Sequence, residues 1–138
     1  MTSLQMLDQW CERFQTADLL EQYDILLEQG MRLKEDEISL EEYKIPGCKV
    51  NFYIKVSRRG EGLELLARSD SLLVGGVIAI LKEVYSGTLQ EIGPLNSPMR
   101  LVESIDDCII NPDIKQNGLK KLCQAMEAAS NANVSAYL

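Results

Sequence analysis

The strongest constraint on the fold is an alternation of apolar and polar residues that follows a Pro-Gly turn. Pro46 and Gly47 lead into a cysteine, and from that point every second residue is apolar: Cys48, Val50, Phe52, Ile54 and Val56. A period of two is typical of a strand with one buried face, so we predict a strand from about residue 49 to residue 56. On this pattern the Cys48 side chain has the parity of the buried face.

A second alternation, at Leu63, Leu65 and Ala67, predicts a strand that returns antiparallel to the first. Residues 57–62 contain two glycines and separate the two patterns, as a hairpin turn does. Because a two-stranded sheet is only marginally stable by itself, a third strand from the region of Leu72 or from residues 99–110 is an open alternative.

Helical periodicity precedes the hairpin. Thr2 and Gln5 fit a capping box at the start of a first helix, and a break at residues 16–18 starts a second one. We expect Gly30 to mark the end of the second helix. Its expected apolar stripe comprises Leu19, Leu20, Tyr23, Leu26, Leu27 and Met31.

After the hairpin, residues 72–85 are apolar nearly all round, which places their helix at the centre of the core. Gly75 and Gly76 lie inside this helix, where each costs about 1 kcal/mol of helix propensity. We therefore expect a close approach of another backbone at these glycines, with the sheet as the candidate partner.

The last helix is predicted from Asn111 as its cap and Pro112 at its first position. Its expected apolar face comprises Leu119, Leu122, Cys123 and Met126. In the stretch before it, Thr88 and Glu91 fit a short capped helix.

This order of elements predicts an α+β fold with a small antiparallel sheet and helices packed on one side of it. The length of 138 residues is that of one domain, so we expect a single domain over residues 1–138.

Charge and composition argue against several classes of protein. A net charge of −7 is unfavourable for binding a phosphate backbone, so we expect no nucleic acid ligand. No run of about 18 apolar residues indicates a membrane span, and the first residues lack the basic segment of a targeting peptide, so the cytoplasm is expected. The chain has no histidine, which rules out Cys-His and Ser-His catalysis and histidine-ligated metals.

The four cysteines are widely spaced and form no Cys-x-x-Cys pair, so we expect free thiols and no zinc site. Cys11 and Cys123 fall on apolar helical faces and are expected in the core. Cys108 lies in a connector between Asp107 and Ile109, where the pattern does not place it. Cys48 is the thiol that a turn delivers to the start of a strand.

Five ordered motifs resemble the SufE family. They are Tyr23-x-x-Leu-Leu-x-x-Gly30-x-x-Leu33, Ile45-Pro46-Gly47-Cys48, Ala67-x-Ser69-Asp70-Ser71-x-x-Val74-x-Gly76, Glu83-Val84-Tyr85-Ser86-Gly87 and Pro112-x-x-Lys115-x-x-Gly118-Leu119. The resemblance covers almost the whole chain and implies an α+β fold related to the IscU-type scaffold. It also implies that the protein accepts sulfur on Cys48 as a persulfide and activates its donor for iron–sulfur cluster assembly.

The partners that this resemblance implies are a SufS-type cysteine desulfurase, which carries the pyridoxal phosphate, and a downstream iron–sulfur scaffold. The protein itself is expected to need no cofactor and to act as a relay of the sulfurtransferase type. Pro46 and Gly47 would set the geometry of the cysteine loop. Lys49 and Lys115 are candidate stabilisers of a thiolate or persulfide anion, and we expect Lys115 to be exposed, so that its removal costs little stability.

The sequence departs from the family at two places. After the cysteine, members carry Gln-Ser-x-Val-Trp where this chain has residues 49–53, Lys-Val-Asn-Phe-Tyr. Before the last helix they carry Pro-Ser-Arg, and here a one-residue insertion brings Lys115 to the arginine position. Both departures concern residues expected to flank Cys48.

Two other functions stay open. One is an iron–sulfur scaffold of the same fold with Cys48, Cys108 and Cys123 as ligands, and the other is an interaction protein that does not relay sulfur. The final acceptor of the sulfur also stays open, and a modified-nucleoside pathway is one option. The oligomeric state stays open as well, with a homodimer as an option.

Overall fold

The computed structural model describes residues 2–33, 41–87 and 92–136. The helices are α1 (Ser3–Thr16), α2 (Leu19–Arg32), α3 (Leu72–Tyr85), α4 (Met99–Ser104), α5 (Pro112–Ile114) and α6 (Lys120–Ala136). The strands are β1 (Phe52–Arg59) and β2 (Gly62–Ser69). Two short 3-10 turns, η1 (Glu41–Tyr43) and η2 (Pro94–Asn96), and a π-helical segment, η3 (Lys115–Leu119), complete the described elements.

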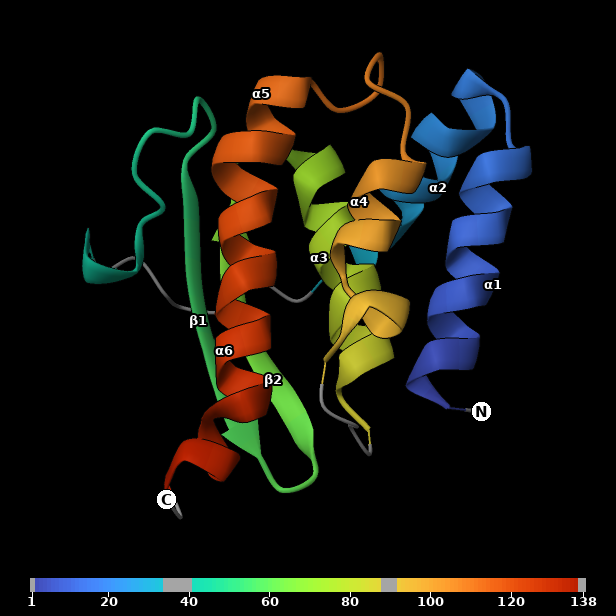
Figure 1. Ribbon diagram of the computed structural model, residues 1–138. Coiled ribbons are helices and arrows are strands. Elements are labelled where there is room, and N and C mark those ends of the chain that lie inside the picture. The colour runs from blue at the N-terminus through green and yellow to red at the C-terminus, as the bar shows by residue number, and fades with distance from the viewer. Residues whose placement is uncertain (1, 34–40, 88–91, 137–138) are drawn as a thin grey trace.

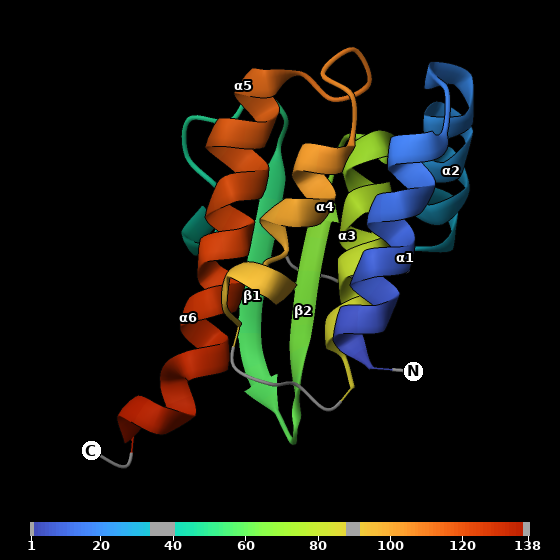
Figure 2. The same cartoon turned by 45° about the vertical axis from the view of Figure 1, so that its right-hand side comes forward.

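The α+β fold is confirmed, with an antiparallel hairpin whose one face is covered by helices. In Figures 1 and 2, α3 lies along β2 and α6 lies along β1. α1 and α2 pack beyond α3, and α4 lies between α1 and α6. Within the described ranges the sheet has two strands. The third strand considered at Leu72 or in residues 99–110 was wrong, because Leu72 begins α3 and residues 99–110 form α4 and the turn that follows it. The expected helix at Thr88 and Glu91 lies outside the described residues.

The hairpin differs from its prediction at both ends of the first strand. β1 begins at Phe52, and the turn is shorter than residues 57–62, because Arg59 pairs with Gly62 across a two-residue loop. Gly60, the first loop residue, has a φ of 60°, which glycine adopts without a steric penalty. A glycine at this place is typical of a type II′ turn, whose twist matches that of the strands.

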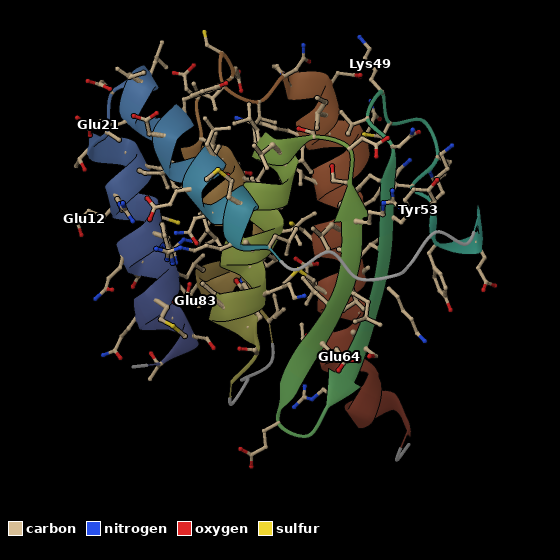
Figure 3. All side chains as sticks on the ribbon, turned by 180° about the vertical axis from the view of Figure 1, so that it is seen from behind. Glu12, Glu21, Lys49, Tyr53, Glu64 and Glu83 are labelled. Atoms are coloured by element: carbon tan, nitrogen blue, oxygen red, sulfur yellow. The ribbon has the colours of Figure 1, made fainter. Side chains whose placement is uncertain are left out.

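The face of the hairpin that meets α3 and α6 is apolar, as the alternation predicts. Its buried residues are Phe52, Ile54, Leu63, Leu65 and Ala67. Lys55 and Arg68 point to the opposite face and are exposed. Figure 3, seen from behind, shows that face of the hairpin in front of α6, with α3 beside β2. The core therefore lies between one face of the hairpin and the helices.

The central helix α3 is held against α2 by close contact of their backbones. A β-carbon on Gly76 would lie 2.3 Å from the carbonyl oxygen of Leu26, and one on Gly30 would lie 2.3 Å from that of Leu72. The close approach at Gly76 is thus present, but its partner is α2 and not the sheet. Gly30 does not end α2, which continues to Arg32. Within the described part of the chain, neither α3 nor another helix is long and apolar enough to cross a membrane.

The predicted apolar stripe of α2 was largely wrong. Leu20 and Met31 are 70% and 73% exposed, whereas the helix buries Gln22, Ile25, Leu26 and Gln29. Gln22 is buried because both ends of its amide find partners: Nε2 donates to the Phe14 carbonyl and Oε1 accepts from the Asp106 backbone N–H, each at 2.9 Å. A buried amide with these bonds satisfied costs far less than a bare one.

The two adjacent glycines of α3 give a matched test of this packing. We expect Gly76→Ala to destabilise the protein by about 1–3 kcal/mol, because its β-carbon would collide with the backbone of α2. Gly75→Ala is the control, since a β-carbon there meets Leu33 at an ordinary 3.6 Å and adds helix propensity. Urea unfolding measures both free energies. Equal unfolding midpoints for the two variants would contradict the assignment of a close contact to Gly76.

Candidate functional site

The four cysteines occupy two kinds of environment. Cys11 and Cys123 are buried at 4% and 1% exposure, which confirms their expected place in the core. Burial raises the pKa of the Cys123 thiol to about 12, with smaller contributions from Glu127 and Glu103, and burial also raises the pKa of Cys11. Burial therefore disfavours the thiolate, which is the reactive form, at both positions.

Cys108 is the exposed thiol, in the turn between α4 and α5. Its backbone N–H donates to the Asp106 carboxylate at 2.8 Å. A hydrogen bond and the negative charge of Asp106 raise the pKa of the Cys108 thiol, and Asp107 adds to the effect. Cys108 is therefore accessible but surrounded by charges that disfavour its thiolate.

Cys48 lies in a short loop that is closed at its base. We call residues Pro46–Asn51 the cysteine loop. The N–H of Ile45 donates to the Phe52 carbonyl at 2.8 Å, and Lys44 forms an antiparallel bridge with Tyr53, so the chain enters and leaves the loop side by side. Gly47 has a φ of 76°, a backbone conformation that favours glycine and turns the chain toward Cys48.

The Cys48 thiol packs on the π-helical segment η3. A β-carbon on Gly118 would lie 2.9 Å from Sγ of Cys48, so the absence of a side chain at Gly118 makes room for the sulfur. Cys48 is half-buried. Strand parity does not explain this, because β1 begins only at Phe52 and the cysteine loop is not part of the strand. Contact with Gly118 covers the sulfur instead.

Two lysines fasten the cysteine loop to the C-terminal helical segments. The Lys121 ammonium donates a hydrogen bond to the Pro46 carbonyl. The Lys49 ammonium lies 3.9 Å from a carboxylate oxygen of Asp113, and its side chain is 74% exposed, so this pair contributes little stability. Lys49 was among the predicted site residues, but Lys121 was not. Lys121 stands three residues after Gly118, and residues with this spacing lie on the same side of a helix. That spacing was the signal in the sequence that could have identified Lys121.

Lys115 does not take the place that the sequence analysis expected. It is buried at 7% exposure, and its ammonium donates to the Ile105 carbonyl and to Asp107, 2.8 Å from a carboxylate oxygen. The expectation of an exposed lysine was wrong, because the connector after α4 supplies two acceptors that hold the ammonium. These bonds join η3 to this connector and not to the cysteine loop.

The family of the chain follows from its sequence. The pattern of the family described as "SufE: Fe-S metabolism associated domain" matches residues 8–130. The chain belongs to the SufE family. Among solved structures, it is similar to the solution structure of a hypothetical protein from Thermus thermophilus, with a TM-score of 0.69 and 14% identity over 94% of this chain and 96% of that one. No curated protein sequence matches the chain significantly.

The helical segment before α6 is a π-helix. The N–H of Lys120 donates to the carbonyl of Lys115, five residues earlier, and such a bond encloses one residue more than an α-helical bond does. A π segment is thus the way in which a helix absorbs a single inserted residue. It lies directly before α6, and it contains Gly118, which lies beneath Cys48.

Substitution of Gly118 tests the contact that covers the thiol. We expect Gly118→Ala to increase the alkylation rate of Cys48 by iodoacetamide several-fold, because the new methyl group displaces the sulfur. Peptide mapping after timed alkylation measures each cysteine separately. The buried Cys11 and Cys123 are the internal control, and their rates are expected to stay unchanged. An unchanged Cys48 rate would show that Gly118 does not control access to the thiol.

Lys115 gives a second matched pair. We expect Lys115→Met to destabilise the protein by about 1–3 kcal/mol, because the change removes a charged donor and leaves the Ile105 carbonyl without it. Lys49→Met is the control at an exposed lysine and is expected to change stability by less than about 0.5 kcal/mol. Thermal and urea unfolding compare the two. Equal losses would mean that the Lys115 bonds add nothing net to the fold.

Proposed function

We propose that this SufE protein accepts sulfur from a SufS-type cysteine desulfurase and carries it on Cys48 as a persulfide for iron–sulfur cluster assembly. The family is described by its association with Fe-S metabolism, which sets the field of chemistry. The observation that carries the proposal is the position of Cys48. It is a half-buried thiol in a loop outside the core, at the cysteine of the family motif.

The transfer needs no group that this chain lacks. The Cys48 thiolate attacks the outer sulfur of the donor's cysteine persulfide, so a bond forms between Cys48 Sγ and that sulfur. The bond between the two donor sulfurs breaks, and the donor cysteine leaves as a thiolate. The exchange moves one sulfur atom with no net oxidation or reduction and requires no histidine.

The other three thiols are less suited to this step. Cys11 and Cys123 are buried, and their pKa values are raised by burial. Cys108 is accessible, but the pKa of its thiol is raised by Asp106. Cys48 also has the means to protect a persulfide between transfers, since its sulfur rests against Gly118 and not in open solvent. Protection matters because persulfides react readily with oxidants and thiols.

Mapping of the sulfur tests the proposal. The protein is incubated with a purified SufS-type desulfurase and cysteine, and intact mass followed by peptide mapping locates the added sulfur. We expect one sulfur atom on Cys48, no adduct in Cys48→Ser, and normal loading in the control Cys108→Ser. An adduct on another cysteine with Cys48 unmodified would overturn the proposal.

The rate of the desulfurase, measured with the same proteins, separates the alternatives. Equal stimulation of the desulfurase by wild type and by Cys48→Ser would identify an interaction protein that does not relay sulfur. For a scaffold, Cys48, Cys108 and Cys123 would have to converge, and no group of three or more potential metal ligands lies together in the described part of the chain. Cys123 is in the core, and Cys108 lies in the connector before α5.

A further inference from the structure

The cysteine loop lies in a stretch of this acidic chain that contains basic residues and no acidic ones. Residues 43–60 contain five lysines and arginines and no aspartate or glutamate. The other 120 residues contain 9 basic and 21 acidic residues. The segment 43–60 begins at the end of η1, forms the cysteine loop and continues into β1. Cys48 therefore lies in the longest stretch of the sequence from which acidic residues are missing.

The fold adds two further cations from the last helix to this stretch. Lys44 is exposed at the base of the cysteine loop, and Lys49 is exposed next to Cys48. Lys121 contacts the loop at Pro46, and Lys120, its neighbour in the same turn, is exposed. We call these four lysines the cationic collar.

Few carboxylates among the described residues offset the collar. Asp113 shares its charge with Lys49 at 3.9 Å, and Asp70 accepts a hydrogen bond from the Asn51 side chain at 2.8 Å. Glu42 is exposed in η1, two residues before Lys44. The four lysines of the collar thus outnumber these three carboxylates by one.

A group of six acidic residues lies on the side of the molecule that is formed by α1 and α2. α1 and α2 carry Asp8, Glu12, Asp18, Glu21, Asp24 and Glu28. Figure 3 shows Glu12 and Glu21 on the side formed by these helices, away from Lys49. The described residues therefore place a group of lysines beside Cys48 and a group of carboxylates on α1 and α2, away from it.

We infer that the cationic collar is the docking surface for an acidic patch that surrounds the reactive sulfur of the partner protein. This inference rests on the proposed function, because it concerns the partner that exchanges sulfur with Cys48. Opposite potentials steer two proteins into contact and orient them before they touch. The same group of lysines repels partners that present a basic surface, so the collar adds selectivity.

Thiol reagents that differ only in charge measure the potential at Cys48 without a partner. The probes are an anionic and a cationic methanethiosulfonate, applied to a Cys108→Ser background. We expect the anionic reagent to react with Cys48 faster than the cationic one, and the ratio of the two rates cancels the effect of partial burial. The preference should fall as salt is raised, because exposed charges are screened.

Each collar lysine should contribute to that ratio. We expect Lys49→Gln and Lys120→Gln each to lower it about threefold at low salt, as Coulomb's law gives for the loss of one nearby exposed charge. Arg13→Gln on α1 is the control with the same change of charge and should leave the ratio unchanged. In a Cys48→Ser background, Cys108 beside Asp106 should prefer the cationic reagent. A rate ratio near one at Cys48 would overturn the inference of a cationic collar. A ratio that is the same in wild type, Lys49→Gln and Lys120→Gln would also overturn it.

Association with the partner tests the docking itself. We measure binding of the protein to a purified SufS-type desulfurase at several salt concentrations, for wild type, Lys49→Glu, Lys120→Glu and the control Arg13→Glu. The collar predicts weaker binding for the two collar variants, a smaller salt dependence, and no change for the control. Sulfur loading of Cys48 with equal affinity in all four proteins would refute the docking surface and leave the proposed function intact. Anion preference at Cys48 without sulfur loading would refute the proposed function instead.

Discussion

A two-stranded hairpin has one apolar face and too little structure to be stable alone, and the rest of this protein depends on how that face is covered. Two helices cover it, α3 along β2 and α6 along β1. α3 in turn is fixed by α2 through backbone contact at Gly76 and Gly30. Because α6 both completes the core and begins at the π segment under Cys48, the same packing that stabilises the hairpin also positions the site.

The site itself is a contact between two segments that lie far apart in the chain, the loop at Cys48 and the π segment at Gly118. The cysteine loop is closed at its base by backbone bonds, so its shape belongs to the hairpin. The surface on which the sulfur rests belongs to η3, whose Gly118 lies beneath the thiol. Lys115, buried in η3, ties this segment to the connector that follows α4. The position of the Cys48 thiol is therefore fixed by helical segments that pack on the core as well as by the cysteine loop itself.

Reactivity in a chain without histidine has to be controlled by access and by charge. The structure separates the thiols along these lines: burial silences Cys11 and Cys123, carboxylates disfavour the Cys108 thiolate, and Cys48 lies among lysines. Exposed lysines beside a thiol attract a partner of opposite charge, and such attraction speeds association.

Local physics decided what the sequence by itself could determine. Thr2, Ser71 and Asn111 cap helices because a side chain bonds a backbone group within three residues, and the alternation at Phe52 and Leu63 fixes which face is apolar. The Pro-Gly turn at Cys48 and the core positions of Cys11 and Cys123 are local in the same sense. The tertiary structure decided those features that depend on residues far away in the sequence. Gln22 is buried because Phe14 and Asp106 supply its hydrogen-bond partners. Lys115 is buried because its ammonium donates hydrogen bonds to Ile105 and Asp107. Lys121 reaches the cysteine loop only because α6 packs beside β1, which periodicity in one segment does not reveal.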